Sequence, residues 1–311
     1  MSFVFLAVGL VLLVVGGDVL VRSASALAVR LGISPLVIGL TVVAFGTSAP
    51  ELAATLVSSV QGAPDIGIGN VLGSNVANVG LILGLAALVA VIPSNEAFVR
   101  RDLPLAIVAM LLLVPMTLDG VLGRWDGIAL LAVLAGYLTL LIRGDGDSLQ
   151  DEVPEEAHGP FWRTIGGALL GLGLLVGGAD LTVRGAVDIA TVLGVPERVI
   201  GLTLVAFGTS LPELASAVAA AVRRQGDMIL GNIAGSNIFN ILAVLGVSAT
   251  ATRIPARTAA LAPDLAVAVL FSVALLGLMA WRGRIARAAG VLLFGGYAAY
   301  VVLLFLPIGP G

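Results

Sequence analysis

The segment GLTVVAFGTSAPEL at residues 39–52 recurs as GLTLVAFGTSLPEL at residues 201–214, with twelve of the fourteen positions identical. A second polar segment follows each copy at the same distance, as GNVLGSNVAN at 69–78 and GNIAGSNIFN at 231–240. Shared hydrophobicity cannot account for this match, because the repeated positions include nearly all the polar ones. We therefore interpret the chain as two homologous halves that align at an offset of 162 residues.

The composition around these segments is that of a membrane protein. Of the 311 residues, 59% are hydrophobic and only 11% are charged, and the mean hydropathy is +1.11, which leaves too little polar surface to solvate a globule. Apolar windows of about 20 residues predict ten spans, starting near residues 2, 35, 66, 103, 125, 161, 197, 228, 259 and 286. We expect an all-α polytopic membrane protein with ten transmembrane helices.

A hydrophilic, acidic stretch at residues 144–160 divides the chain near its midpoint. We predict a first five-helix repeat at 1–143, an acidic linker at 144–160 and a second five-helix repeat at 161–311. Because five is an odd number of spans, the second repeat would enter the membrane from the opposite side, so the repeats would be inverted. The linker resembles a calcium-binding loop, but Gln150 stands where such a loop needs glycine, so we expect a solvated loop there.

Arginine placement predicts the orientation. With the N-terminus outside, eleven of the sixteen basic residues fall in inner loops. The positive-inside rule then places both termini outside the cell and the linker in the cytoplasm, in a multi-pass protein of the plasma membrane.

The residue inventory excludes several classes of protein. A net charge of −3 offers no basic face for nucleic acid. There is no cysteine, and the single histidine, His158, lies in the linker, so thiolate sites, a histidine zinc motif and imidazole catalysis in the membrane are excluded. An enzyme is not expected, nor a resident cofactor, nor an obligate protein partner, and any bound metal must be held by oxygen.

Glu51 and Glu213 are the only acids well inside the second and seventh predicted spans. A carboxylate at that depth costs about 2.5–3.5 kcal/mol on insertion scales, so it indicates function. Pro50 and Pro212 lie beside them, where each should kink its helix and free a backbone carbonyl. Further oxygen-bearing side chains occur at a spacing of four, which would place each pair on one helix face: Thr47 with Glu51, Thr209 with Glu213, Ser74 with Asn78, and Ser236 with Asn240.

This set of oxygens suits a hard cation. Ca²⁺ takes 6 to 8 oxygen ligands in flexible geometry, from carboxylates, carbonyls, amides and water. Two carboxylates supply about the charge of one Ca²⁺, and Na⁺, which is nearly the same size, can use the same oxygens. Mutually exclusive occupancy, and hence exchange, is physically reasonable.

The motifs GTSAPE (46–51) and GTSLPE (208–213), each followed by a GSNxxN segment (73–78 and 235–240), resemble the alpha repeats of the cation/calcium exchanger superfamily, most closely those of prokaryotic sodium/calcium exchangers. The resemblance covers nearly the whole chain. It implies a central cavity that binds either Ca²⁺ or about three Na⁺, and alternating access by sliding of the first and sixth helices.

The resemblance also implies ligands. Ca²⁺ would lie on the carboxylates of Glu51 and Glu213 and the carbonyls of Thr47 and Thr209. At Asn240 some members of the superfamily carry aspartate, including the potassium-dependent branch, so asparagine argues against K⁺ co-transport. Flanking Na⁺ sites would use the same glutamates and further oxygens, with Asn78 lining the centre: the carbonyls of Ala44 and Ala206 and the hydroxyls of Ser48, Ser74, Ser210 and Ser236.

Other interpretations remain open at this point. A membrane glutamate can be a protonated structural residue, and serine and asparagine on membrane helices commonly form packing hydrogen bonds. Ca²⁺/H⁺ exchange through the same glutamates would need no Na⁺, and a cation channel would need no counter-ion.

Structural roles are expected for two other groups of residues. The glycine pairs Gly69 with Gly73 and Gly231 with Gly235 have the spacing of close helix packing. Asp18 with Arg22, and Asp180 with Arg184, have the spacing of local ion pairs on a helix.

Overall fold

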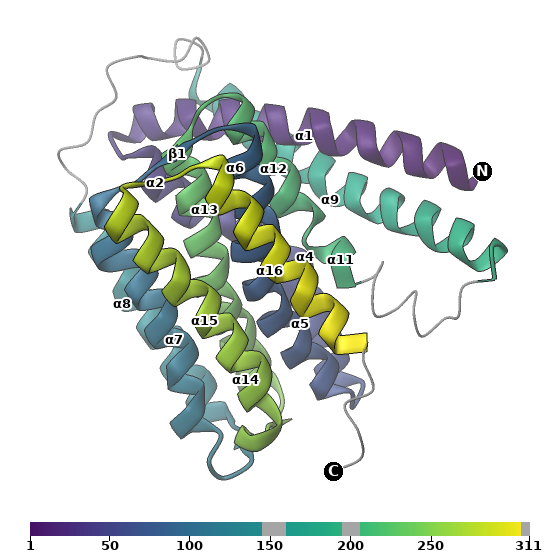
Figure 1. Cartoon of the computed structure of the whole chain (residues 1–311), viewed down its shortest axis with the longest axis vertical. Coiled ribbons are helices and arrows are strands. Elements are labelled where there is room, and N and C mark those ends of the chain that lie inside the picture. The colour runs from purple at the N-terminus through teal and green to yellow at the C-terminus, as the bar shows by residue number, and fades with distance from the viewer. Residues whose placement is uncertain (145–159, 195–205, 306–311) are drawn as a thin grey trace.

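The computed structural model describes residues 1–144, 160–194 and 206–305, and these residues form a bundle of helices (Figure 1). The first half contains α1 (Ser2–Leu31), α2 (Pro35–Ile38), η1 (Gly39–Val43), α3 (Ala44–Thr47), α4 (Ala49–Val60), α5 (Pro64–Ala77), η2 (Asn78–Leu83), α6 (Gly84–Val89), η3 (Phe98–Asp102), α7 (Leu103–Met116) and α8 (Arg124–Gly144), where η denotes a π-helical segment. The second half contains α9 (Phe161–Val192), α11 (Ala206–Thr209), α12 (Leu211–Val222), α13 (Gly226–Phe239), η6 (Asn240–Leu245), α14 (Gly246–Ala251), α15 (Thr258–Arg282) and α16 (Arg287–Phe305).

The helix boundaries repeat as the sequence does. At an offset of 162 residues, α4 corresponds to α12, α5 to α13, η2 to η6 and α6 to α14, with both ends of each pair in register. Even the change from α-helix to π-helix falls at equivalent asparagines, Asn78 and Asn240. The sequence repeat is therefore also a structural repeat.

Most of the predicted spans are present as long apolar helices. Seven helices among the described residues are long and apolar enough to cross a membrane, and α2–α3 with α4 add a pair bent by 44°. The fourth predicted span is the shorter α7, which continues η3. The seventh, predicted to start near residue 197, includes α11 and residues of α12, and its part before residue 206 lies outside the described residues. The described residues thus form a polytopic helical membrane protein, and the total of ten spans remains a prediction.

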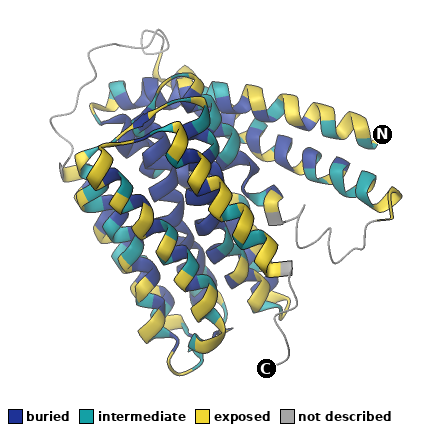
Figure 2. Cartoon of the chain, viewed as in Figure 1, coloured by how far each residue is buried: buried dark blue, intermediate teal, exposed yellow. Residues whose placement is uncertain are grey.

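The most buried part of the bundle consists of α5–η2–α6 and α13–η6–α14 (Figure 2). Most of the span from Gly226 to Ala251 is buried within the protein, whereas α15 and α16 expose much of their surface. Gly231 and Gly235 allow α13 to pack closely on the second span, because a Cβ atom at Gly235 would lie 2.7 Å from the Leu40 carbonyl oxygen. The packing role predicted for Gly231 and Gly235 is confirmed. By the repeat, Gly69 and Gly73 would pack on residues 198–206, which are largely outside the described part, so their role stays a prediction.

The two longest helices, α1 and α9, lie side by side and are steeply inclined to the rest of the bundle (Figure 1). Glycines on α9 bring the two backbones close together. A Cβ atom at Gly171 would lie 2.6 Å from the backbone nitrogen of Leu20, and one at Gly185 would lie 2.6 Å from that of Leu6. Because Cβ atoms do not approach backbone atoms so closely, only glycine fits this seam.

Four two-residue strands link the halves: β1 (Ile92–Pro93), β2 (Val121–Leu122), β3 (Ile254–Pro255) and β4 (Arg284–Ile285). β1 pairs antiparallel with β4, and β2 pairs antiparallel with β3. Both pairings join the first half to the second. The halves are therefore interlocked at their connecting loops.

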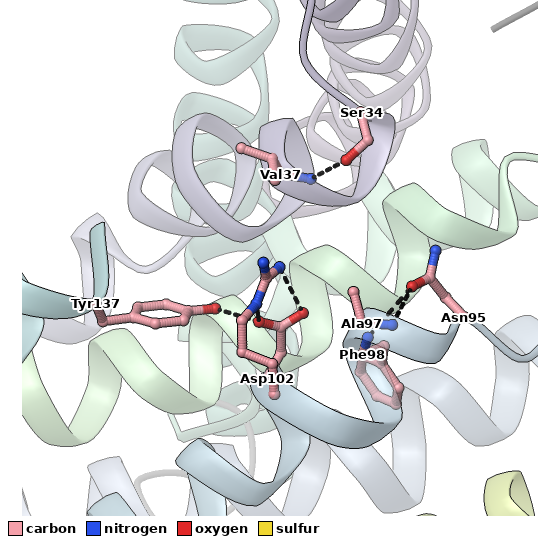
Figure 3. Close-up of polar contacts among 8 residues, drawn as sticks. Ser34, Val37, Asn95, Ala97, Phe98, Asp102 and Tyr137 are labelled. Atoms are coloured by element: carbon pink, nitrogen blue, oxygen red, sulfur yellow. Dashed lines mark hydrogen bonds and ion pairs between the residues drawn. The ribbon is translucent and has the colours of Figure 1, made fainter. Parts of the chain in front are cut away.

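Asp102 is a third fully buried carboxylate, and its charge is compensated locally (Figure 3). Its Oδ1 accepts hydrogen bonds from the Tyr137 hydroxyl at 2.9 Å and from Arg101 Nε at 2.7 Å. Nearby, the Asn95 side chain accepts hydrogen bonds from two backbone amides at the start of its helix, and the Ser34 side chain accepts one at the start of α2 (Figure 3). A buried carboxylate with such partners is structural, which distinguishes Asp102 from the two glutamates described next.

Candidate cation site

Each glutamate lies just after a break in its helix. The second span bends where α3 ends at Thr47 and α4 begins at Ala49, and Pro50 occupies the first turn of α4. The predicted kink is confirmed by the 44° bend. In the second half, α11 ends at Thr209 and α12 begins at Leu211.

These breaks overturn one detail of the sequence interpretation. Thr47 and Glu51 do not share a face of one continuous helix, and neither do Thr209 and Glu213. The spacing rule assumes an unbroken helix, and here the backbone turns at the intervening serine. Both glutamates instead stand in the first turn of a helix, where the exposed N–H groups favour a negative charge.

The two carboxylates are buried and are tied across the repeat. Glu51 is 1% exposed and Glu213 is 2% exposed. Ser48 Oγ donates to Glu213 Oε1 at 3.2 Å, and Ser210 Oγ donates to Glu51 Oε1 at 3.5 Å, so each half binds the acid of the other. The serine that binds each carboxylate lies three residues before the other carboxylate, so the two acids stand at adjoining helix breaks. Their meeting in the interior is the geometry that a bound cation would stabilise.

The remaining predicted side chains extend this polar network. Ser74 Oγ lies 3.5 Å from Ser210 Oγ, and Ser236 Oγ donates to Asn232 Oδ1 at 3.5 Å. Thr47 Oγ1 lies 3.4 Å from the same Asn232 Oδ1.

Equivalent contacts occur on the opposite side. Thr209 Oγ1 donates to Asn70 Oδ1 at 3.3 Å, as Thr47 does to Asn232. The Ala44 carbonyl accepts the backbone N–H of Ser48 at 3.0 Å at the end of α3, and Ala206 is the first residue of α11. The predicted residues thus lie at or beside the two helix breaks and on the two central helices that face them.

Asn78 and Asn240 are buried where the two central helices become π-helical. Such π-helical turns are frequent at functional sites. Asn78 Nδ2 donates to Asn237 Oδ1 at 2.9 Å, and Asn240 Nδ2 donates to Asn75 Oδ1 at 2.9 Å. Both predicted asparagines are therefore held by an asparagine of the other half.

Four buried oxygens of these residues have no hydrogen-bond partner in the structure: Glu51 Oε2, Glu213 Oε2, Asn78 Oδ1 and Asn240 Oδ1. A buried polar group without a partner costs about 1–3 kcal/mol, and more when it is charged. All four are acceptors, so a cation or a water can satisfy them. The described residues contain no cluster of three or more acidic or histidine side chains, so the charge of the site is limited to the two glutamates, which suits one divalent ion.

Four asparagines of this network were not among the predicted ligands: Asn70, Asn75, Asn232 and Asn237. They contact the predicted residues directly. Their signal was available in the sequence, since Asn70 and Asn232, and Asn75 and Asn237, repeat at the same offset as the glutamates.

One side of the site is covered by α1. A Cβ atom at Gly17 would lie 2.8 Å from the carbonyl oxygen of Ala215 on α12, so the two backbones touch. Asp18 forms the predicted local ion pair with Arg22 and also accepts a hydrogen bond from Arg223 Nε at 2.8 Å. Ser25 Oγ adds a hydrogen bond of 2.6 Å to Gln225.

The equivalent face of α4 is open. Ala53, Ala54 and Val57 of α4 are exposed, Val57 to 50%, whereas the equivalent residues of α12 are partly or fully buried: Ala215, Ser216 and Ala219. On α9, Asp180 and Arg184 form their predicted local ion pair but are 53% and 67% exposed. The structure is therefore closed on the side of α12 and exposed on the side of α4.

Comparison with known proteins places this architecture in a family. The family model described as "Sodium/calcium exchanger protein" matches residues 1–143 and 163–306. The chain is 34% identical to the sodium/calcium exchanger MaX1 of Methanosarcina acetivorans, over 98% of this chain and 98% of that protein. It is 39% identical to the inner membrane protein YrbG of Escherichia coli, over 96% of this chain and 95% of that protein. A structure of the sodium-calcium exchanger NCX_Mj soaked with Na⁺ and Sr²⁺ matches with a TM-score of 0.86 and 34% identity, over 98% of this chain and 99% of that one.

Proposed function

The chain belongs to the sodium/calcium exchanger protein family and is a cation/Ca²⁺ antiporter, and from this premise we propose that it uses inward Na⁺ flow to drive Ca²⁺ out of the cell. Glu51 and Glu213 are the shared ligands of both ions. The observation that supports this most directly is their crossed contact: each buried carboxylate is bound by the serine of the other half and keeps one oxygen unpartnered.

The remaining ligands are those that the resemblance to the exchanger superfamily implies. Ca²⁺ is held by the two glutamates and the carbonyls of Thr47 and Thr209, with the amide oxygens of Asn78 and Asn240 at the centre. Na⁺ uses the glutamates and the flanking oxygens: the carbonyls of Ala44 and Ala206 and the hydroxyls of Ser48, Ser74, Ser210 and Ser236. Because every ion needs the glutamates, the two cargoes exclude each other.

Coupling follows from that exclusion. We infer an exchange of about three Na⁺ for one Ca²⁺, which moves one net charge per cycle and is worth about 2.3 kcal/mol per 100 mV. Transport is then driven by the membrane potential as well as by the Na⁺ gradient.

The proposed orientation has both termini outside, the acidic linker inside and the repeats inverted. The loop that carries Arg223 and Arg224 is then cytoplasmic, and the exposed face of α4 is external. The structure in this assignment faces outward, with α1 closing the inner side.

The test is uptake of radioactive Ca²⁺ by proteoliposomes in which gradients of Na⁺, K⁺ and pH are imposed one at a time. An outward Na⁺ gradient is expected to drive uptake, and an inside-negative potential is expected to slow it, because each uptake cycle carries net positive charge outward. Uptake driven by a pH gradient without Na⁺ would instead establish Ca²⁺/H⁺ exchange. Flux without any counter-ion would indicate a channel.

A further inference from the structure

Four asparagines at the centre of the protein form two crossed amide pairs. Asn78 Nδ2 donates to Asn237 Oδ1, and Asn240 Nδ2 donates to Asn75 Oδ1, both at 2.9 Å. Each pair joins one repeat to the other, and all four side chains are at most 1% exposed. The two hydrogen bonds are equivalent under the repeat.

These bonds fix the orientation of two amides that lie in the cation site. In a planar amide the oxygen and the nitrogen diverge from the same carbon. When a neighbouring residue accepts a hydrogen bond from Nδ2, the Oδ1 atom of that amide therefore points away from this neighbour. The Oδ1 atoms of Asn78 and Asn240 are indeed the ones without a hydrogen-bond partner. The opposite orientation would present NH₂ groups, which cannot bind a cation.

Asn78 and Asn240 are also placed next to the serines of the site. The backbone N–H of Asn78 bonds the carbonyl of Ser74, and that of Asn240 bonds the carbonyl of Ser236. Ser74 Oγ in turn lies 3.5 Å from Ser210, which binds Glu51. Each oriented amide therefore stands one helical turn after a serine of the site.

Asn75 is itself held in place. Its Nδ2 donates to the backbone carbonyl of Asn237 at 3.3 Å, which leaves its Oδ1 as the acceptor for Asn240. The acceptor role of Asn75 is thus set by the backbone of the opposite repeat. Neither Asn75 nor Asn237 contributes an oxygen to the proposed ligand set.

We propose that Asn75 and Asn237 are positioning residues that turn the amide oxygens of Asn240 and Asn78 toward the transported cation. This inference rests on the proposed function, because it takes the cation site as given. It assigns each positioning residue to one specific ligand, Asn75 to Asn240 and Asn237 to Asn78. A residue that merely packs α5 against α13 would have no such assignment.

The crossed assignment can be tested by double-mutant cycles. The apparent affinity for Ca²⁺ is measured by isothermal titration of the full-length protein in detergent and, in parallel, as the KM of Na⁺-driven Ca²⁺ uptake. Asn75→Ala is expected to weaken binding by about 10- to 100-fold, the effect of removing a residue that orients a metal ligand. Combined with Asn240→Ala it should add little, whereas combined with Asn78→Ala it should keep its full effect.

Asn237→Ala provides the mirror experiment. It should lose its effect in the Asn78→Ala background and keep it in the Asn240→Ala background. Equal effects in both backgrounds, for either residue, would overturn the inference and leave these asparagines as helix-packing residues. Residues in one hydrogen-bonded network couple in such cycles, while independent sites add.

A second pair of variants covers the case in which an alanine variant fails to fold. Asn237→Asp keeps the oxygen that accepts from Asn78, replaces an NH₂ group that has no hydrogen-bond partner with a second oxygen, and adds a negative charge. Asn237→Leu has a similar volume and no acceptor. The aspartate variant is expected to bind Ca²⁺ at least as tightly as the original protein, and the leucine variant more weakly; equal weakening by both would contradict the inference.

The outcome also separates the inference from the proposed function. If the unaltered protein shows no Na⁺-driven Ca²⁺ uptake, the proposed function fails. If uptake is normal and requires both glutamates while the asparagine cycles are additive, only the positioning role fails.

Discussion

The two halves of the protein agree at the proposed cation site and differ at the long helices that flank it. At the site, the helix breaks, the pair Glu51 and Glu213, and the crossed serine contacts all repeat at the same offset. At the flank, the residues that hold α1 have no equivalent. Arg223, which binds Asp18, corresponds to Gln61, and Gln225, which binds Ser25, corresponds to Ala63.

This difference separates two tasks of an antiporter. A site that is loaded from either face needs equivalent ligands in both halves, and the repeated centre provides them. A structure that is closed on one face has unequal contacts at its two flanks, and a ligand shifts the balance between the two faces only if it binds one state more tightly than the other. Substitutions at equivalent positions should therefore have equal effects at the proposed cation site and unequal effects at the long helices.

The largest effect is expected at the centre. Glu51→Gln and Glu213→Gln should each reduce Na⁺-driven Ca²⁺ uptake by more than about 100-fold, since even residues outside the ligand shell cost 10- to 100-fold. The two losses should be similar in size. Asp180→Asn, on the exposed part of α9, serves as the control and should retain uptake.

That experiment has a clear negative outcome. If either glutamine variant transports normally, its glutamate is not a shared ligand. If one variant is inactive and the other retains substantial uptake, the centre is functionally unequal despite its repeated sequence.

The next largest effect is expected at the glycine seam between α1 and α9. Gly171→Ala should destabilise the protein by about 1–3 kcal/mol, because the added methyl group would collide with the backbone of Leu20. Gly173, two residues further along α9, is exposed and has open space at its Cβ position, so Gly173→Ala should be neutral or stabilising by up to about 1 kcal/mol. Thermal unfolding in detergent measures both. Equal shifts would mean that the seam does not hold the two helices together.

The open and covered faces can be compared at one equivalent pair of positions. Val57 on α4 and Ala219 on α12 are related by the repeat, but Val57 is 50% exposed and Ala219 lies beneath Gly17 of α1. The chain has no cysteine, so Val57→Cys and Ala219→Cys are unique reporters. If closing the α12 side is worth about 1.4 kcal/mol, maleimide should label Val57→Cys about tenfold faster than Ala219→Cys. Equal rates would contradict a protein that is closed on one side.

The smallest effect is expected from the ion pair that holds α1. Arg223 and Asp18 are 29% and 41% exposed, and such pairs contribute at most about 1 kcal/mol. Arg223→Gln should therefore speed the labelling of Ala219→Cys by about fivefold. Loss of the positive charge would by itself slow the thiol, so faster labelling reports opening.

The matched control lies on the other long helix. Arg184 pairs with Asp180 within α9, and Arg184→Gln should leave the labelling rate unchanged. If Arg223→Gln also leaves it unchanged, α1 is held by its packing on α12 and not by the ion pair.

The sequence was most informative where two independent signals coincided. A buried acid beside a proline, found twice, predicted two buried carboxylates beside helix breaks, because proline lacks the N–H of a helical hydrogen bond and is favoured in the first turn of a helix. The packing of Gly231 and Gly235 was equally predictable, since their spacing places both glycines on one face of a continuous helix.

Other features could not be predicted because they depend on tertiary contacts. Periodicity placed Thr47 and Glu51 on one face, and this was wrong since the chain turns at Ser48 between them. The repeated motif also could not predict which face is closed, because both halves carry the same motif. That distinction depends on Arg223 and Gln225, which lie outside the motif and contact α1 only in the folded protein.

The short strand pairs between the halves have a consequence for biosynthesis. Ile92 pairs with Ile285, so the loop around β1 has no strand partner until nearly the whole chain has been translated. During translation, the first half therefore lacks this pairing until β4 has left the ribosome. Truncation just before β4 would remove the strand partner of β1 and leave this link between the halves unmade.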